Sequence, residues 1–397
     1  MNILIICHFF PPHKGGVETA AYNTVKELSK LGHNVAVLTS RERINISNLE
    51  KFQNFKIFRY KSYYLPEIRH LPQSSNLGLV PKALLNLPKI IRKYKIDIIH
   101  LEGRLFPISL FSALMNLIVF KRPMFLTIQG RLRGGFTNYI EYFFDLFVTK
   151  LVYTKLNKII CVSESLKIYL NKLGKIRERL IVIPNGVDIH LFKKVDSANF
   201  LDKYLDKDKN VKKVIFVGRL DHQKGVQYLI KAIPLILKRY KKVHFFILGN
   251  GNLEPQLKQL SKNLNVQSNL EFINMIPLDK MPEFYSSADI FCLPSLYEGF
   301  PLSIAEALSI GLIIVASNVE GIPEAITENE NGFLFEPRNV EQLSQKLIKA
   351  LTLNQEQINK ITQNNRKLAR KEYSWEIITK KIEKLYKDSL YEDHNLK

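Results

Sequence analysis

The fold can be deduced from one stretch, residues 289–308, which reads DIFCLPSLYEGFPLSIAEAL. The apolar run 289–293 has the length of a buried strand. Gly299 then permits a tight turn, and Pro301 stands where the first turn of a helix favours proline. A strand, a tight loop and a helix in succession are typical of an α/β fold built on a parallel sheet.

The start of the predicted helix is a candidate anion site. The first N–H groups of a helix have no partner within the helix, and the helix dipole makes that end positive. We therefore expect the backbone around Phe300, Pro301 and Leu302 to bind phosphate.

Two carboxylates flank this helix start. Glu298 lies in the loop and Glu306 lies in the helix, a little over two turns further on. Glu306 stands among small and apolar residues, where a carboxylate needs a specific hydrogen-bond partner. The alternative is that Glu298 only stabilises the helix dipole and that Glu306 is an exposed helix residue. A phosphate cradle between two carboxylates suits a nucleoside diphosphate sugar, whose vicinal hydroxyls carboxylates can bind.

Glu298, Gly299, Phe300 and Pro301, followed by Glu306, resemble the E-x7-E signature of the retaining glycosyltransferases of family four, or glycosyl transferases group one. The resemblance implies the GT-B fold, in which two Rossmann-like, doubly wound parallel-sheet domains face a cleft. It also implies that Glu298 contacts the donor sugar and that Glu306 contacts the ribose.

The two halves of the chain begin alike, each with a strand, a loop, a helix and a second strand. The first pair of strands is expected at 2–7 and 34–39, and the second at 214–218 and 243–248. The alternation continues and predicts parallel sheets with helices on both faces. Further strands are expected at 97–101, 123–128, 157–162, 181–183, 270–274, 289–293, 312–316 and 333–335. The predicted domains are 1–185 and 186–372, with a last helix in 373–397 that the resemblance returns to the first domain.

Arg219 and Lys224 lie on the loop after the first strand of the second half. A guanidinium fork and an ammonium point charge together can neutralise a diphosphate without a metal ion, although solvated surface cations are the alternative. The resemblance assigns both residues to the donor phosphates.

Four other residues of the second half are expected around the donor nucleotide. Gly249 and Gly251 shape the rim beside the Arg219 loop. Met275 and Ile276 follow another strand and are expected to meet the base mostly through backbone atoms.

The first half contributes fewer candidates. Gly15 and Gly16 would let the backbone approach the diphosphate, although a tight turn explains them equally well. His100 ends the strand predicted at 97–101, so we expect it to face the cleft and to account for any ionisation between pH 5 and 8. A structural role is the alternative for His100. Gln129 stands where family members frequently have a histidine near the transferred sugar, and we expect it to orient the donor. These two residues join Glu298, Arg219 and Lys224 as the expected catalytic set.

The positive charge is concentrated in the first half of the chain. Residues 1–185 contain 28 Lys and Arg against 11 Asp and Glu, which gives +17 of the total +21. Nucleic acid, an anionic membrane surface and a phosphorylated acceptor all fit this charge, and a lysine-rich proteome is the uninformative explanation. Nucleic acid is not expected, because the chain lacks recognition motifs and interleaved surface aromatics.

Two apolar segments are expected to be buried helices. The first, 105–120, is short for a membrane span. The second, the aromatic run 139–153, has membrane contact as its alternative. No leader sequence is evident, and the three cysteines lie in apolar strand-like runs, as reduced core thiols do. The predicted location is cytoplasmic, peripheral to the inner face of the cell membrane.

Together with these observations, the resemblance implies a retaining, metal-independent hexosyl- or N-acetylhexosaminyltransferase. It would move a sugar from a nucleotide sugar to a glycan or lipid-linked acceptor in cell-surface polysaccharide or glycolipid synthesis. No cofactor is expected, and the D-x-D sequence at 206–208 is expected to be solvated surface. The alternatives are a sugar-nucleotide epimerase or hydrolase on a similar fold and a basic nucleic-acid-binding protein.

Overall fold

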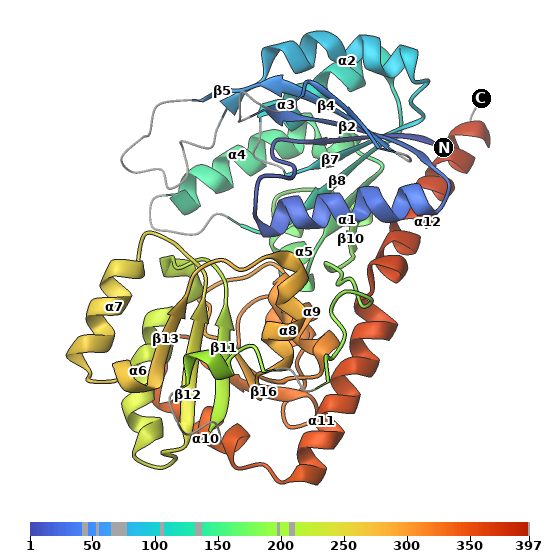
Figure 1. The fold of residues 1–397 in the computed structure, drawn as a ribbon. Coiled ribbons are helices and arrows are strands. Elements are labelled where there is room, and N and C mark those ends of the chain that lie inside the picture. Colours follow the sequence, from blue (N-terminus) through green and yellow to red (C-terminus); the bar gives the residue numbers. More distant parts are fainter. Residues whose placement is uncertain are drawn as a thin grey trace. The chain divides into compact units, whose positions relative to one another are not determined.

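The computed structural model describes residues 1–41, 47–52, 55–64, 78–103, 107–131, 137–196, 199–205 and 211–395. The chain forms two compact units, of which unit 1 is Met1–Pro184 with Trp375–Lys397 and unit 2 is Asn185–Ser374 (Figure 1). The chain therefore passes from one unit to the other within two residues of the expected positions. The D-x-D sequence at 206–208 lies outside the described residues.

Unit 1 contains an eight-stranded sheet in the order β10-β9-β8-β7-β1-β2-β4-β3. Its neighbouring strands are parallel except for β3 and β4, which form an antiparallel pair at one edge. The strands are β1 (Asn2–Cys7), β2 (Asn34–Arg41), β3 (Leu49–Lys51), β4 (Phe55–Lys61), β7 (Ile98–Glu102), β8 (Met124–Ile128), β9 (Lys158–Cys161) and β10 (Leu180–Val182), with β5 (Tyr63–Tyr64) and β6 (Gly78–Leu79) as a separate antiparallel pair.

The helices of unit 1 include the last helix of the chain. This helix lies beside α1 (Figure 1), and Nε2 of His33 is 2.8 Å from Oε1 of Glu383 on it. Its return to the first unit is the arrangement that the resemblance implied. The helices of this unit are α1 (Gly16–Lys30), α2 (Pro81–Lys93), α3 (Pro107–Met115), α4 (Thr137–Leu151), α5 (Glu164–Asn171) and α12 (Trp375–Asn395).

Unit 2 contains a fully parallel six-stranded sheet in the order β13-β12-β11-β14-β15-β16. The strands are β11 (Lys212–Val217), β12 (Val243–Leu248), β13 (Leu270–Ile273), β14 (Ile290–Leu293), β15 (Ile313–Ser317) and β16 (Gly332–Phe335). The helices are α6 (Val226–Leu237), α7 (Glu254–Asn263), α8 (Met281–Ser286), α9 (Leu302–Ile310), α10 (Val340–Leu351) and α11 (Gln355–Leu368).

The strands form where the sequence has apolar runs. All four residues of β14 and all five of β15 are buried, as expected for parallel strands that helices cover on both faces. Cys7, Cys161 and Cys292 are buried free thiols, as the sequence predicts.

Three details of the prediction are wrong. Pro301 is the N-cap of α9 and not its first-turn residue, because its ψ of 126° is extended and the helix begins at Leu302. The segments 105–120 and 139–153 were expected to be buried, but each has an exposed apolar side. Helix α4 buries Val148, whereas Phe143 is 65% exposed. Apolar composition alone does not determine how much of a helix neighbouring elements cover.

No helix in the described part of the chain combines the length and the apolar character that crossing a bilayer requires.

Candidate functional site

The strongest candidate site lies in unit 2, at the carboxyl ends of β11 and β14. These strands are neighbours, but the chain reaches β12 and β13 on the other side of β11 before it returns to form β14. This reversal of strand order is the position where open α/β sheets bind ligands. The two loops that follow these strands carry Arg219, Lys224 and Glu298.

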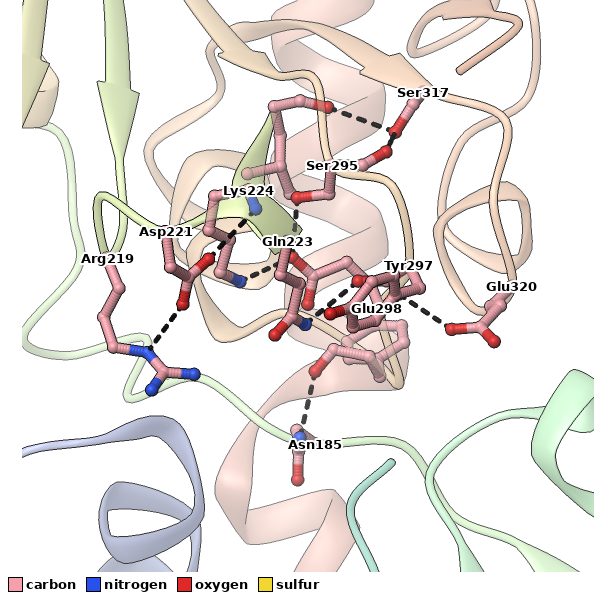
Figure 2. Close-up of polar contacts among 12 residues, drawn as sticks. Asn185, Arg219, Asp221, Gln223, Lys224, Ser295, Tyr297, Glu298, Ser317 and Glu320 are labelled. Atoms are coloured by element: carbon pink, nitrogen blue, oxygen red, sulfur yellow. Dashed lines mark hydrogen bonds and ion pairs between the residues drawn. The ribbon is translucent and has the colours of Figure 1, made fainter. Parts of the chain in front are cut away.

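The structure brings Lys224 and Glu298 together. Nζ of Lys224 is 2.5 Å from Oε1 of Glu298, and the hydroxyl of Ser295 donates to the same oxygen at 2.7 Å (Figure 2). The carboxylate is buried, with a relative exposure of 6%. A cation and a hydroxyl thus hold one carboxylate oxygen in a fixed position.

A glycine allows the two loops to approach each other. Gly225 has φ 65°, and a Cβ on it would lie 2.0 Å from the carbonyl oxygen of Pro294. Two hydrogen bonds of Gln223 reinforce this contact: its carbonyl accepts from the N–H of Leu296 at 2.8 Å, and its side-chain amide donates to the carbonyl of Tyr297 at 3.0 Å. Larger residues at position 225 would separate the loops.

Arg219 lies on the same loop as Lys224 but is more exposed. Nε of Arg219 is 3.6 Å from Oδ2 of Asp221, whose other carboxylate oxygen accepts from the N–H of Lys224 at 3.2 Å (Figure 2). The side chain of Arg219 is 58% exposed and is therefore accessible to an anionic ligand.

Other contacts within unit 2 hold the loop that leads into α9. The side-chain amide of Asn185 donates to the carbonyl of Phe300 at 3.0 Å, and the ring of Phe300 packs on Tyr373 with centroids 5.0 Å apart. The start of α9 at Leu302 is therefore fixed in place, with its first N–H groups outside the helical hydrogen-bond ladder.

Glu306 has the specific partner that its apolar surroundings predict. The hydroxyl of Tyr285 donates to its Oε2 at 2.7 Å. Burial raises the pKa of Glu306 to about 7, and the hydrogen bond from Tyr285 partly opposes this rise. Glu306 therefore changes its protonation state close to neutral pH.

The remaining donor-site candidates lie at the ends of β12 and β13. Gly249 has φ 148°, and a Cβ on it would be 1.9 Å from the carbonyl oxygen of Gly218. A Cβ on Gly251 would be 2.4 Å from the carbonyl oxygen of Leu220, so both glycines allow the neighbouring loop to pack closely. Met275 is exposed and Ile276 is partly exposed after β13, and both are accessible to a ligand.

Gly15 and Gly16 lie in unit 1, whereas the donor-site candidates described above lie in unit 2. Gly16 is the first residue of α1 and Gly15 is its N-cap. A Cβ on Gly15 would overlap the carboxylate of Glu18, which itself lies 2.9 Å from Nδ1 of His13. A side chain at position 15 would displace the carboxylate of Glu18, and a phosphate role for both glycines remains a prediction.

The structure corrects the expected position of His100. It lies in the middle of β7 and not at its end, because the strand is Ile98–Glu102, and its side chain is fully buried. Its Nδ1 contacts the hydroxyl of Tyr386, and its Nε2 contacts the hydroxyl of Thr127 at 2.7 Å. Burial lowers the pKa of His100 to about 3. The imidazole is therefore neutral at physiological pH and does not titrate between pH 5 and 8.

The residue that ends β7 is Glu102, which the sequence analysis missed. Its carboxyl group is buried, with Oε1 3.7 Å from Nε2 of His100. Burial raises the pKa of Glu102 to about 8, and interactions with the side chains of Gln129 and Thr127 partly oppose the rise. Glu102, and not His100, is therefore the group near Gln129 that titrates close to neutral pH. A carboxylate at the end of an apolar strand was the available signal.

The chain matches two family models that together cover most of its length. The model described as Glycosyltransferase Family 4 matches residues 14–191, and the model described as Glycosyl transferases group 1 matches residues 198–368. The second match includes every candidate residue in unit 2.

Three similar proteins cover nearly the whole chain. The GPI3 subunit of phosphatidylinositol N-acetylglucosaminyltransferase from Saccharomyces cerevisiae is 27% identical over 89% of this chain and 75% of its own length. The structure of sucrose-phosphate synthase from Thermosynechococcus elongatus is 20% identical, with a TM-score of 0.83 over 98% of this chain and 99% of that one. The structure of HepE from Anabaena, solved with UDP and with UDP-glucose, is 18% identical, with a TM-score of 0.75 over 98% of this chain and all of that one. The two structural matches establish the GT-B fold, which consists of two Rossmann-like units.

Proposed function

This chain is a glycosyltransferase of group 1 and family 4, and we propose that it transfers a sugar from a nucleoside diphosphate donor with retention of anomeric configuration. The observation that carries the proposal is the Lys224–Glu298 pair beside the start of α9. It combines a cation for the leaving diphosphate with a carboxylate for the sugar.

The proposed chemistry needs no nucleophilic side chain. The bond between the anomeric carbon and the diphosphate breaks while the acceptor oxygen forms its bond on the same face of the sugar. Lys224, Arg219 and the N–H groups at the start of α9 stabilise the negative charge that develops on the diphosphate. Since Lys224 and the start of α9 are held in place before the donor binds, their stabilisation costs little reorganisation. Because the two side chains supply positive charge at this point, we propose that the reaction is independent of metal ions.

The proposed substrates follow from the site and from the similar proteins. HepE is solved with UDP and UDP-glucose, which supports a nucleotide-sugar donor for the same fold. The GPI3 subunit belongs to an enzyme named for N-acetylglucosaminyl transfer to phosphatidylinositol, which supports an N-acetylhexosamine donor and a lipid-linked acceptor. We place such a reaction at the inner face of the cell membrane, in the synthesis of cell-surface glycan or glycolipid.

Product analysis tests the proposed reaction. Incubation with α-linked nucleotide sugars and a lipid-linked acceptor, in buffer containing EDTA, should give a product whose new bond is α in the proton NMR spectrum. A β-linked product would contradict retention, and a complete loss of activity in EDTA that Mg²⁺ or Mn²⁺ restores would contradict metal independence.

We expect nucleotide binding to depend on the protonation of Glu306. Only its ionised form can accept two charge-assisted hydrogen bonds from a ribose, so affinity for a nucleoside diphosphate should rise as pH increases through about 7. Glu306→Gln should weaken binding by about 1–3 kcal/mol above this pH and remove the dependence on Glu306. The measurement is the dissociation constant by calorimetry between about pH 5.5 and 8.5.

The phosphates of the nucleotide also titrate in this pH range, and their effect is the same for both proteins. It therefore cancels in the ratio of the dissociation constants of Glu306→Gln and the wild type. Tyr285→Phe is the matched comparison, because it removes the hydrogen bond that lowers the pKa of Glu306. In this variant the rise of nucleotide affinity should therefore have its midpoint at a higher pH than in the wild type. A ratio of one over the whole range would refute the ribose role, and a constant ratio above one would refute the dependence on protonation.

Two segments of unit 1 expose apolar side chains, which supports membrane contact. Among the described residues, Ile118 is 76% and Val119 is 55% exposed in the π-helical turn Asn116–Phe120, and Lys121 and Arg122 follow directly. Separately, helix α4 exposes the rings of Phe143 and Phe147. Exposed apolar side chains next to cations are typical of proteins that bind an anionic bilayer.

We therefore expect the protein to sediment with vesicles that contain anionic phospholipid and to dissociate as salt rises. Ile118→Asp combined with Val119→Asp should reduce this binding on the order of 10-fold, because it removes apolar contact and adds charge repulsion. The control is Leu278→Asp in unit 2, where Leu278 is 63% exposed, and this variant should bind as the wild type does. Equal binding of the wild type to neutral and anionic vesicles would disprove the electrostatic part.

A further inference from the structure

Glu320 has an unusual backbone conformation beside the donor loop. Its φ is 45°, in the left-handed region that residues with a Cβ rarely occupy, and it follows β15 in the turn that leads to Gly321. A glycine would adopt this conformation without strain. A glutamate held there suggests that its side chain has a specific task.

The carboxylate of Glu320 binds the backbone of Glu298. Its Oε2 accepts a hydrogen bond from the N–H of Glu298 at 2.8 Å (Figure 2). An ionised acceptor makes this bond stronger than an ordinary backbone hydrogen bond. It fixes the main chain at the residue directly before Gly299, where the chain has the most conformational freedom.

A second contact connects the same two loops. The hydroxyl of Ser317, at the end of β15, donates to the carbonyl of Ser295 at 2.5 Å, and the hydroxyl of Ser295 in turn donates to the carboxylate of Glu298 (Figure 2). Ser317 and Glu320 therefore hold the loop after β14 at two points. Ser317 binds the main chain of Ser295, whose hydroxyl contacts the Glu298 carboxylate, and Glu320 binds the main chain of Glu298.

We propose that Glu320 is a positioning residue that holds the main chain of Glu298 so that its carboxylate stays on Lys224 and in place for the donor sugar. The inference rests on the proposed function, because it assigns to Glu298 the sugar contact described above. Glu320 itself touches neither the sugar nor the diphosphate in this assignment.

Two substitutions separate the hydrogen bond from the backbone conformation. Glu320→Gly removes the carboxylate and relieves the left-handed conformation, so its thermal midpoint should equal or exceed that of the wild type. Glu320→Gln keeps the length of the side chain and an acceptor oxygen but removes the charge. We expect the turnover number to fall on the order of 10-fold in the glycine variant and about 3-fold in the glutamine variant. The dissociation constant for the nucleoside diphosphate should change less than about twofold in both.

A double-mutant cycle tests whether Glu320 acts through Glu298. In a Glu298→Gln background, Glu320→Gly should reduce turnover by less than about twofold, because the carboxylate that it positions is already absent. A full additional 10-fold loss would overturn the inference. So would wild-type turnover in Glu320→Gly, or a fall in turnover that accompanies a lower thermal midpoint.

Hydrogen exchange gives a result that does not depend on activity. In the full-length, unliganded protein, Glu320→Gly should accelerate exchange of the peptide that contains Glu298 and leave the peptide that contains β11 unchanged. Unchanged exchange at Glu298 would overturn the positioning role even if the protein is a glycosyltransferase. Conversely, if no nucleotide sugar reacts but exchange accelerates as expected, the proposed function fails and the structural hold of Glu320 on Glu298 stands.

Discussion

Lys224→Met is expected to lower the rate of sugar transfer by about 10²- to 10³-fold, the loss typical of removing one preorganised group that stabilises developing charge. The ammonium is the cation closest to the buried carboxylate of Glu298, and we propose that it also meets the departing diphosphate. Methionine keeps the length and apolar body of the side chain, so the change mainly removes charge. The measurement is the turnover number for nucleoside diphosphate release at saturating donor.

The same change should also reduce stability, because it leaves the Glu298 carboxylate buried without its counter-ion. Breaking a buried ion pair on one side costs about 3–5 kcal/mol, although the partial exposure of Lys224 lowers this figure. Combining Lys224→Met with Glu298→Gln removes both charges, so it should restore most of the stability but none of the rate. Lys231→Met, an exposed lysine of α6, is the matched control and should change neither property. A rate within threefold of the wild type would rule out a role for Lys224 at the diphosphate.

Glu298→Gln is expected to lower turnover on the order of 100-fold while the nucleotide still binds. The amide can still accept the hydrogen bond from Ser295, but it cannot pair with Lys224 or make a charge-assisted bond to a sugar hydroxyl. The loss should therefore fall on the turnover number, with less than about a threefold change in the dissociation constant for the nucleoside diphosphate.

Glu330→Gln, an exposed carboxylate elsewhere in unit 2, is the control for loss of one negative charge and should behave as the wild type. If Glu298→Gln lost nucleotide affinity as strongly as it lost turnover, Glu298 would belong to the nucleotide site and not to the sugar site. Unchanged turnover would remove Glu298 from the mechanism.

The sequence predicts the sheets well because their strands are buried on both faces. Runs such as 2–7, 243–248 and 289–293 are almost uniformly apolar, and the structure places β1, β12 and β14 there with at most one residue of difference. The short edge strand β3 has only three residues, two of them charged, so no periodic pattern marks it.

The candidate site is predictable only where its residues are neighbours in the sequence. The loop 298–306 and the pair Arg219 and Lys224 could each be identified from their own segment. The contact between Glu320 and Glu298 could not, because it joins two loops through the pairing of β14 with β15. The burial of His100 depends in the same way on Tyr386 in the last helix, 286 residues away in sequence.

Surface exposure is the other property that the sequence did not determine. The apolar residues of 105–120 and 139–153 are consistent with a buried helix or with a helix that leaves one side uncovered. The structure shows that Ile118, Val119, Phe143 and Phe147 are exposed, which adds apolar contact to the charge that already suggested a membrane surface.

Calorimetric titration with a panel of nucleotide sugars tests the central claim most directly, namely that the start of α9, Glu306 and the Lys224–Glu298 pair form a donor site. The full-length protein should bind at least one UDP-, GDP-, ADP- or dTDP-sugar with a dissociation constant in the micromolar range. Glu306→Gln should weaken this binding about 10-fold or more at pH 8. A donor site at these residues would be ruled out if no nucleotide sugar bound at millimolar concentration, or if the one that bound had the same affinity for the variant as for the wild type.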